Sequence, residues 1–465
     1  MQIPLKKTLE HLAPQWPENL LPAIRCKLKQ ANVSVVVLDD DPTGTQTVYD
    51  VPILTNWTAN SLAQEFEKAI PLFYVLTNSR SVPQSAAESL AREIGTNLQE
   101  ASHRTGRSFA VISRSDSTMR GHFPAEVDAL AQALGLEEAV RVIAPFFLEG
   151  GRYTINDVHY VREGEFLVPA AETQFAKDAV FDYSNSNLKQ WVEEKTQGKV
   201  SADSVVSFTL DDIRTGGPER VTEKLLQCNS NDVCVVNAAA YRDLEVFILS
   251  LLSAEQSGTK LLCRTAASFV RTRAGLSSHP LLAANQLPLN KNGRGLVIIG
   301  SYVPRSSTQL YHLLENTQIK GIEIQVERLC EQTRNTEIER AAAAAEKGLS
   351  QNSDVVLFTS RKLITGRNSQ SNLAIGNLIS DGLVKIVKNI STKPRYILAK
   401  GGITSSDIAT KALGIKRGWV LGQILPGVPV WQTGHETRFP GMAYIVFPGN
   451  VGGPEAITKI VDDLS

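Results

Sequence analysis

The sequence predicts an α/β protein of two domains, each a mainly parallel sheet flanked by helices. The chain has 465 residues, more than a single hydrophobic core usually covers. Short apolar, β-rich segments alternate with helical patterns, which is typical of βαβ units. The alternation stops at 275–295, a stretch rich in Ser, Pro, Asn and Gly, and then restarts. We therefore expect domains at 1–290 and 291–465, with the active site in the cleft between them.

In the first half, strand and helix patterns follow one another in a regular order. Strands are predicted at 33–38, 72–77, 109–113 and 139–144, and helices at 59–70, 84–102 and 124–134. The middle helix places Ala87, Leu90, Ala91, Ile94 and Leu98 on one face. Residues 150–182 are less regular, and strands at 233–237 and 261–264 then enclose a helix at 244–252.

The second half repeats the alternation. Strands are predicted at 296–299, 322–326, 355–359, 396–399, 419–424 and 443–447. Helices are predicted at 307–314, 337–349, 372–387 and 454–464, and the alanine run at 341–345 strongly favours the second of these.

Composition excludes several classes of protein. Lys+Arg and Asp+Glu number 48 each, so no basic excess supports binding to nucleic acid or to an anionic membrane. No apolar run is long enough to span a membrane, and residues 1–20 lack the apolar core of a signal peptide. The five cysteines form no CxxC pair and the seven histidines show no metal-ligand spacing. We expect a cytoplasmic protein without a metal site of its own.

Polar strings follow consecutive predicted strands of the first half, at 39–45, 77–80, 114–121 and 145–152. Carboxyl ends of parallel strands meet at one edge of a sheet, where open α/β folds bind ligands. These strings are therefore expected to converge.

Three adjacent carboxylates, Asp39, Asp40 and Asp41, repel one another and need cations, hydrogen bonds or raised pKa values to coexist. A simple turn is the alternative, because Asp, Pro, Thr and Gly all form turns. A carboxylate here could accept the proton of a substrate hydroxyl. The candidate bases are Asp40, Asp41 and Asp116, and we favour Asp41 because it adjoins the turn at Thr43.

The string 114–121 combines guanidinium, carboxylate and hydroxyl groups, which suits a small polyhydroxy acid. Arginine can bind the carboxylate in a forked geometry while Asp, Ser and Thr bind hydroxyls. A surface loop with an Arg–Asp pair is the alternative. Arg80 and Arg152, at neighbouring strand ends, add positive charge. His122 and His159 are expected to make polar contacts rather than to act as acid or base.

Glycine-rich strings follow strands of the second half, at 300–301, 401–404 and 449–453. Glycines let backbone N–H groups approach a phosphate closely, although such strings also form ordinary tight turns. No Walker A string is present and no G-x-G-x-x-G follows a strand. This disfavours a P-loop NTPase and a standard dinucleotide-dependent oxidoreductase.

Taken in order, these strings resemble the four-carbon acid sugar kinase family, from about residue 33 to the C-terminus. The family's Asp-Asp-x-Thr-Gly, Thr-x-Ser-Arg and Lys-x-Asp-Ser-Thr-x-Arg-Gly strings are similar to 40–44, 77–80 and 114–121. Further similarity to the family lies at 144–152 and 172–178 in the first half, and at 300–301, 401–404, 426–429 and 449–450 in the second half. The chain departs from the family pattern at Leu76, at Arg114, where Lys is usual, and at Phe447-Pro448, where a Lys commonly precedes the Gly-Asn.

The resemblance implies an ATP-dependent kinase of a small sugar acid that uses Mg²⁺, with the acid in the first domain and the nucleotide in the second. The implied substrate-binding residues are Thr43, Gly44, Ser79, Arg80, Arg114, Ser117, Thr118, Arg120, Gly121 and Arg152. The implied nucleotide-binding residues are Ser301, Gly401, Gly402, Ile403, Thr404, Gly427, Gly449 and Asn450.

A non-catalytic sensor that binds a sugar acid and a nucleotide is the alternative function, favoured by the replaced lysines, and an oxidoreductase is a weaker third choice. The expected partners are small molecules, not nucleic acid or a membrane, and a homo-oligomer is left open.

Overall fold

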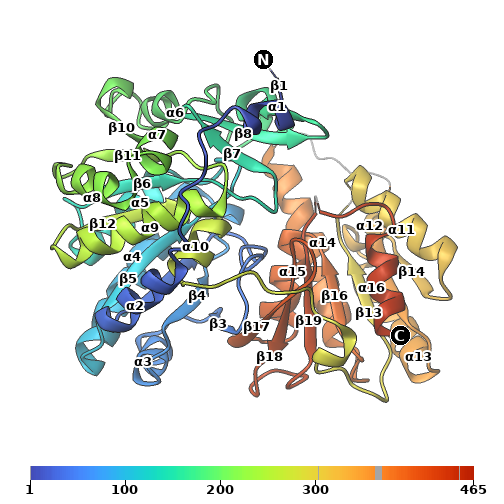
Figure 1. The fold of residues 1–465 in the computed structure, drawn as a ribbon. Helices are drawn as coiled ribbons and strands as arrows, with labels where there is room; N and C mark the ends of the chain where they lie inside the picture. Colours follow the sequence, from blue (N-terminus) through green and yellow to red (C-terminus); the bar gives the residue numbers. More distant parts are fainter. Residues whose placement is uncertain (1, 302, 362–368, 450) are drawn as a thin grey trace. The chain divides into compact units, whose positions relative to one another are not determined.

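The computed structural model describes residues 2–301, 303–361, 369–449 and 451–465 (Figure 1). The chain divides into two compact units, and each is α/β, which confirms the predicted fold class. The first unit contains Met1–Val48 and Asn56–Ser278, and the second contains Tyr49–Thr55 and His279–Ser465. The short segment Tyr49–Thr55 thus leaves the first unit and contributes a strand to the second.

The first unit is built on a parallel sheet of strand order β10-β11-β6-β12-β5-β2-β4. Every residue of the interior strand β2 is buried, as expected for a parallel strand covered on both faces. The strands are β2 (Ser34–Asp39), β4 (Leu72–Leu76), β5 (Phe109–Arg114), β6 (Val140–Ala144), β10 (Val206–Phe208), β11 (Val233–Val236) and β12 (Leu261–Thr265).

The helices of the first unit follow the predicted periodicity. The long helix α4 buries Ala87, Ala91, Ile94 and Leu98, and it ends at Gly106, whose φ of 68° gives the left-handed C-cap that glycine favours. The helices are α1 (Leu5–Glu10), α2 (Leu21–Ala31), α3 (Ala59–Glu67), α4 (Gln84–Thr105), α5 (Ala125–Leu134), α6 (Leu188–Lys195), α7 (Leu210–Arg214), α8 (Gly217–Leu226), α9 (Tyr241–Gln256) and α10 (Ala267–Arg273).

Residues 150–182, which the sequence pattern left unassigned, contain most of a small antiparallel sheet of order β1-β9-β8-β7. Its strands are β1 (Ile3–Pro4), β7 (Arg152–Ile155), β8 (Val158–Glu163) and β9 (Phe166–Pro169). Because β7 begins at Arg152, this sheet positions a predicted site residue.

The second unit has a mixed sheet of order β3-β17-β18-β19-β16-β13-β15-β14. β19, β16, β13, β15 and β14 run parallel, whereas β3, β17 and β18 pair antiparallel. The strands are β3 (Val51–Leu54), β13 (Leu296–Ile299), β14 (Lys320–Ile324), β15 (Val355–Thr359), β16 (Ile397–Lys400), β17 (Arg417–Leu425), β18 (Val428–Thr433) and β19 (Ala443–Phe447). The predicted strand at 419–424 is therefore one arm of a hairpin whose other arm, β18, the sequence did not indicate.

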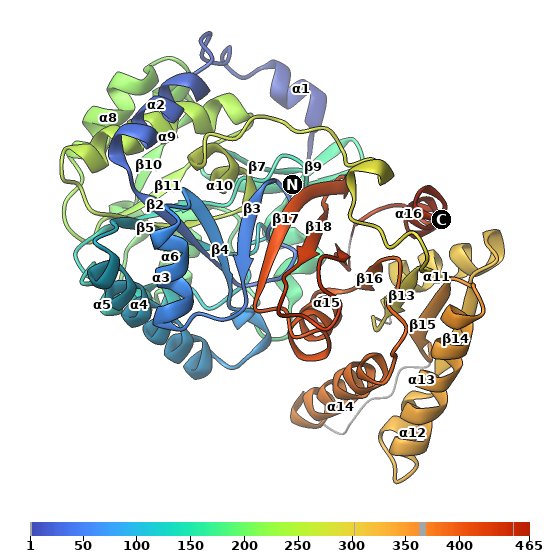
Figure 2. The same cartoon turned by 90° about the horizontal axis from the view of Figure 1, so that it is seen from below.

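Figure 2 shows helices on both faces of this sheet, with α11 and α16 on one face and α13 and α14 on the other. The C-terminal helix α16 buries Ile457, Ile460, Val461 and Leu464 in the core of the unit. The helices are α11 (Pro304–Asn316), α12 (Val326–Leu329), α13 (Arg334–Ser350), α14 (Ser369–Lys388), α15 (Gly402–Asp407) and α16 (Ala456–Leu464).

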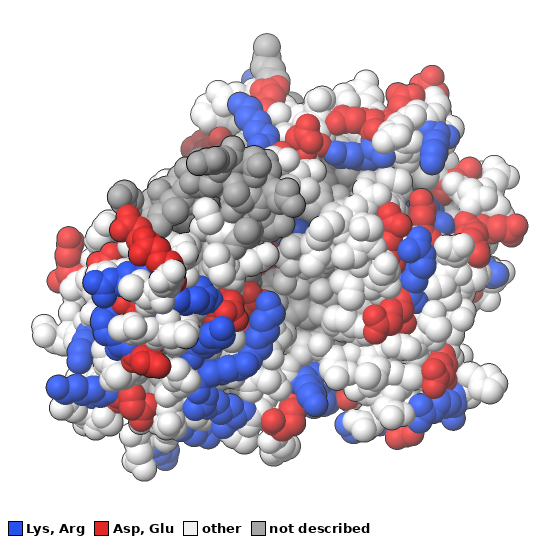
Figure 3. Space-filling model, turned by 180° about the vertical axis from the view of Figure 1, so that it is seen from behind, with Lys and Arg blue, Asp and Glu red and all other residues white. Residues whose placement is uncertain are grey.

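The surface reflects the balanced composition. On the face drawn in Figure 3, basic side chains lie among acidic and uncharged ones. Within the described part of the chain, no helix has the length and apolar character needed to cross a membrane.

Candidate functional site

The predicted polar strings of the first unit meet in a buried group of charges, which we name the carboxylate–guanidinium cluster. Strands β2 and β5 pair in register, so Asp39 lies beside Arg114, and Arg114 Nη1 is 3.1 Å from Asp39 Oδ1. Arg80, which follows β4, forms ion pairs with Asp41 and with Asp116, the latter at 3.1 Å. The members of the cluster are Asp39, Asp40, Asp41, Arg80, Arg114, Asp116 and Arg120.

Asp39 is fully buried, and its contacts fit a structural role. Burial raises its pKa to about 7, against the opposing charge of Arg114. A Cβ atom at Gly44 would overlap the Asp39 carboxylate, so the glycine allows the turn after β2 to close over this group. Asp39 therefore helps to hold the loop that carries its two neighbours.

Asp41 is held tightly by its neighbours. Its Oδ1 accepts a hydrogen bond of 2.8 Å from the backbone N–H of Thr43 and another from the Thr43 hydroxyl, and its Oδ2 accepts one from Arg80. Burial alone would raise its pKa, but Arg80 and Thr43 bring the pKa of Asp41 below its usual value.

The environment of Asp40 differs from those of Asp39 and Asp41. It is 3% exposed, and neither of its carboxylate oxygens has a hydrogen-bond partner among the described residues. Arg114 Nη1 lies 3.7 Å from its Oδ1, and a Cβ at Gly121 would lie 3.3 Å from its Oδ2. Burial raises the pKa of Asp40, although Arg80 and Arg114 oppose the shift. A buried carboxylate whose acceptors are all free can take a proton or a substrate hydroxyl.

Asp116 is a strongly paired anion. Arg120 Nε donates to its Oδ2 at 2.8 Å, Arg80 approaches its Oδ1, and the Thr118 hydroxyl also donates to it. Against the effect of burial, these partners hold the pKa of Asp116 well below its usual range.

Arg120 and Arg152 approach the same aromatic ring. Each guanidinium carbon lies 5.3 Å from the centroid of the Phe175 ring. Arg120 also pairs with Asp178 at 3.4 Å, whereas the buried Nε of Arg152 finds no hydrogen-bond partner in the described part of the chain. Burial lowers the pKa of Arg152, with Asp116 opposing. Arg120 and Arg152 can therefore bind an additional carboxylate without first losing all their internal contacts.

The histidines make polar contacts with the loops of the site. His159 Nε2 lies 2.7 Å from the carbonyl oxygen of Ser117, and burial lowers the pKa of His159 to about 4, so the ring is neutral near pH 7. His122 Nε2 lies 3.2 Å from the carbonyl oxygen of Ser79 and 2.9 Å from that of Val82. The two imidazole rings thus help to hold the backbone at Ser117 and at Ser79.

Sequence reasoning missed two buried charged residues beside the cluster. Arg264 of β12 donates to the carbonyl oxygen of Arg120 at 3.0 Å and lies over the ring of Trp191. Glu126 of α5 has a pKa raised to about 7 by burial and accepts a hydrogen bond from Ser79. An arginine inside an apolar strand pattern was the available signal for Arg264, because a buried charge needs partners.

In the second unit, the strings that follow β13 and β16 lie together. A Cβ at Gly300 would overlap the Thr404 hydroxyl, and a Cβ at Gly401 would lie 3.4 Å from the Cβ of Ser301. Gly401 has a φ of 109°, which favours glycine, and Gly402 begins α15 with Ile403 exposed.

A second pair of loops lies beside one another in the same unit. Gly427, in the turn between β17 and β18, would place a Cβ 3.5 Å from the side chain of Val451. A Cβ at Gly449 would meet no described atom within 4 Å. Asn450, predicted to bind nucleotide, lies outside the described residues. Most of the predicted nucleotide-binding residues are therefore found at two neighbouring sets of strand ends of one sheet.

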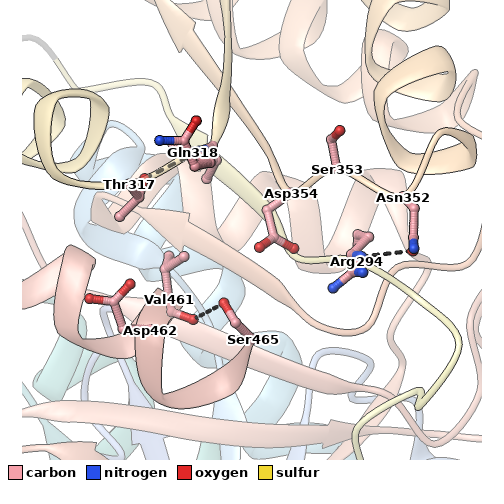
Figure 4. A pocket seen from close by; sticks show the side chains of 10 residues that line it. Arg294, Thr317, Gln318, Asn352, Ser353, Asp354, Val461, Asp462 and Ser465 are labelled. Atoms are coloured by element: carbon pink, nitrogen blue, oxygen red, sulfur yellow. Dashed lines mark hydrogen bonds between the residues drawn. The ribbon is translucent and has the colours of Figure 1, made fainter.

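A cavity of about 310 Å³ in the second unit lies elsewhere (Figure 4). Its lining includes Arg294, two residues before β13, and Asp354 and Ile319, which directly precede β15 and β14. These are the amino ends of the strands, whereas the glycine loops follow carboxyl ends, so the cavity is separate from the predicted nucleotide site.

Among the described residues, no group of three or more His, Cys, Asp or Glu side chains is arranged to hold a metal ion. Any divalent cation at the cluster would therefore need ligands from a bound molecule or water.

Comparison with known proteins finds two domain models that match successive parts of the chain. Residues 35–273 match a sugar-binding N-terminal domain and residues 296–457 match a nucleotide-binding C-terminal domain. The chain belongs to the four-carbon acid sugar kinase family, in which these two domains occur together.

Curated relatives include two D-threonate kinases. That of Salmonella typhimurium LT2 is 25% identical over 391 residues, which cover 79% of this chain and 83% of that protein. That of Bordetella bronchiseptica is 30% identical over 128 residues, which cover 28% of this chain and 29% of that protein.

Two solved structures share the fold. A Salmonella typhimurium LT2 protein has a TM-score of 0.67 at 16% identity, covering 93% of this chain and 99% of its own. A Haemophilus influenzae protein has a TM-score of 0.63 at 17% identity, covering 92% of this chain and 100% of its own.

Proposed function

We propose that this protein is an ATP-dependent kinase that phosphorylates a hydroxyl group of a four-carbon sugar acid of the threonate type. The observation that carries the proposal is the buried carboxylate–guanidinium cluster at the carboxyl edge of the first sheet. In this cluster, no described residue forms a hydrogen bond with the Asp40 oxygens. The similarity to the D-threonate kinase of Salmonella typhimurium LT2, over 79% of this chain, supports the substrate class.

In this proposal, the first unit binds the acid. Arg120 and Arg152 bind its carboxylate, since both lie over Phe175 and Arg152 has a free buried donor. Polar groups at the other strand ends bind its hydroxyls. These groups belong to Thr43, Gly44, Ser79, Ser117, Thr118 and Gly121, while Arg80 and Arg114 hold the aspartates in place.

We propose Asp40 as the base that accepts the proton of the attacking hydroxyl. The sequence favoured Asp41, but Asp41 and Asp116 are engaged by arginines that stabilise their ionised forms and make them weak bases. Asp40 has free acceptors and a raised pKa, both of which favour proton transfer. As the hydroxyl oxygen attacks the γ-phosphorus of ATP, its proton would pass to Asp40 and ADP would leave.

The second unit would bind ATP through Ser301, Gly401, Gly402, Ile403, Thr404, Gly427 and Gly449, with Asn450 as a further candidate. Mg²⁺ would neutralise charge on the phosphates, whose oxygens suit this hard cation. The unpartnered oxygens of Asp40 also suit a contact through water.

The direct test is turnover on a panel of four-carbon sugar acids with MgATP, followed by detection of ADP and of the phosphorylated acid. Formation of a phosphorylated acid supports the kinase. Binding of an acid and of ADP without turnover under all conditions would instead support a sensor, and phosphorylation of none of the panel with no ADP binding would contradict the proposal.

Arg120→Ala is expected to raise KM for the acid about 30-fold, because an Arg contact to a charged group contributes roughly 2 kcal/mol. The Arg120→Lys variant keeps the charge but loses the forked geometry. Its KM should therefore lie between those of the wild type and of Arg120→Ala. Steady-state kinetics on the best substrate measures this effect. An unchanged KM and kcat in Arg120→Ala would remove this residue from the substrate site.

Gly449→Val is expected to weaken ADP binding by about tenfold or more, a cost of about 1.4 kcal/mol. A Cβ at this position meets no described protein atom within 4 Å, so the variant should fold normally and obstruct only a ligand. Calorimetric titration with ADP measures the effect, and the melting temperature of the free variant is its control. Full ADP affinity in the folded variant would contradict the placement of the nucleotide at this loop.

A further inference from the structure

Lys400 is a buried cation that the proposed mechanism has not used. It is the last residue of β16 and is 0% exposed. Its Nζ donates to the carbonyl oxygens of Pro448 at 2.6 Å and Gly449 at 3.1 Å, and it lies 4.3 Å from the centroid of the Phe447 ring. The side chain therefore links the end of β16 to the loop after β19.

Among the described residues, the charge of this buried ammonium group is not compensated by an acid. Within the described ranges, Lys400 forms no ion pair with a carboxylate, whereas most buried charges are paired. Two carbonyl groups and an aromatic face stabilise it in part. Burial, together with the charge of Arg305, lowers the pKa of Lys400 to about 7.

In the described part of the neighbouring elements, no carboxylate acts as a partner of Lys400. β13 places Ile299 beside it in register, and β19 places Phe447 there. α11 contributes Arg305, a second cation. On α15, Asp407 binds Lys411 at 2.8 Å and the Ser380 hydroxyl instead.

Its position suggests what the missing counter-charge is. Gly401 and Gly402 follow it directly, and one of its acceptors is the carbonyl of Gly449, so it stands between two loops proposed to bind nucleotide. A phosphate group at these loops would favour the ammonium form by direct attraction. A bound phosphate would thereby supply the negative partner of the Lys400 ammonium group.

We propose that Lys400 is a positioning residue of the nucleotide site, whose ammonium group holds the loop after β19 against the start of the Gly401 loop and is kept protonated by the bound phosphates. This role rests on the proposed function. It follows that nucleotide binding is coupled to uptake of a proton near and above neutral pH. The coupling distinguishes this role from ordinary packing, which would not change with pH.

The test is calorimetric titration of MgADP into the full-length protein at about pH 8 in two buffers of different ionisation enthalpy, because Lys400 is then largely deprotonated in the free protein. The wild type should take up a fraction of a proton on binding. Lys400→Met, similar in length and uncharged, should bind ADP about tenfold more weakly and show correspondingly less proton uptake. Lys411→Met, on an exposed lysine of the same unit, should match the wild type.

The outcomes separate the two proposals. If the wild type binds MgADP without proton uptake, or if Lys400→Met shows the wild-type affinity and uptake, the role of Lys400 is wrong while the nucleotide site stands. The wild-type measurement decides even if Lys400→Met fails to fold. If the wild type binds no nucleotide at all, the proposed function is wrong and the role of Lys400 with it.

Discussion

Asp40→Asn is expected to lower kcat by a factor of about 10² or more while the sugar acid still binds. Asparagine preserves the shape of the side chain but cannot accept the hydroxyl proton. The Asp40 carboxylate is the member of the cluster whose two oxygens both lack hydrogen-bond partners, so its replacement breaks no hydrogen bond of the free protein. Steady-state kinetics and a binding titration with the acid measure the two effects separately.

Two variants control this experiment. Asp128→Asn replaces a carboxylate of α5 whose side chain is 61% exposed and should leave turnover unchanged. Asp41→Asn removes the partner of Arg80 and should affect KM more than kcat. If Asp41→Asn loses turnover and Asp40→Asn does not, Asp41 is the base, as the sequence first indicated.

The pH profile provides an independent check on the base. A general base must be ionised, so activity should rise with pH through the pKa of Asp40, and burial places that pKa above the usual value for aspartate. A profile that is flat down to the ordinary range of aspartate would instead indicate one of the two carboxylates whose pKa values are lowered, Asp41 or Asp116.

The sequence predicted the fold where a local pattern was sufficient. Buried parallel strands such as β2 and β5 are short apolar runs that stop at polar residues, and a helix such as α4 repeats its apolar face over many turns. β3 was missed because it has only four residues, includes Pro52, and is stabilised by β17 more than 360 residues later. The small sheet around β7 was missed because its strands are short and partly polar.

The convergence of the site was predictable in the same way, because parallel strands carry their terminal loops to one edge. The division of labour among its charges was not. Adjacent carboxylates look alike in the sequence. Only the three-dimensional pairing shows that Arg80 binds Asp41, while the Asp40 oxygens accept no hydrogen bond from the described residues. Likewise, the sequence does not distinguish Lys400 from other polar residues at strand ends, because its burial is evident only in the structure.

Arg80→Met is expected to destabilise the protein by about 3 kcal/mol at neutral pH, because removing one partner of a buried ion pair leaves its counter-charge uncompensated. Arg80 pairs with Asp41 and Asp116, and its side chain is 15% exposed. Although burial alone would lower it, these carboxylates and Asp40 hold the pKa of Arg80 well above its usual value. Urea denaturation at neutral pH measures the loss. Arg92→Met is the matched control, since its ion pair with Glu88 lies on the surface and should contribute less than about 1 kcal/mol.

The dependence of this loss on pH tests its electrostatic origin. In the wild type, the lowered pKa values of Asp41 and Asp116 contribute stability above the ordinary pKa of aspartate, and that stability is lost as pH falls through the lowered values. Without Arg80 this contribution is reduced, so the difference between variant and wild type should be largest at neutral pH and should shrink as the medium becomes acidic enough to protonate the aspartates. A loss that is the same at both pH values would indicate packing by the arginine stem instead, and a variant as stable as the wild type at neutral pH would show that the cluster does not depend on Arg80 for its charge balance.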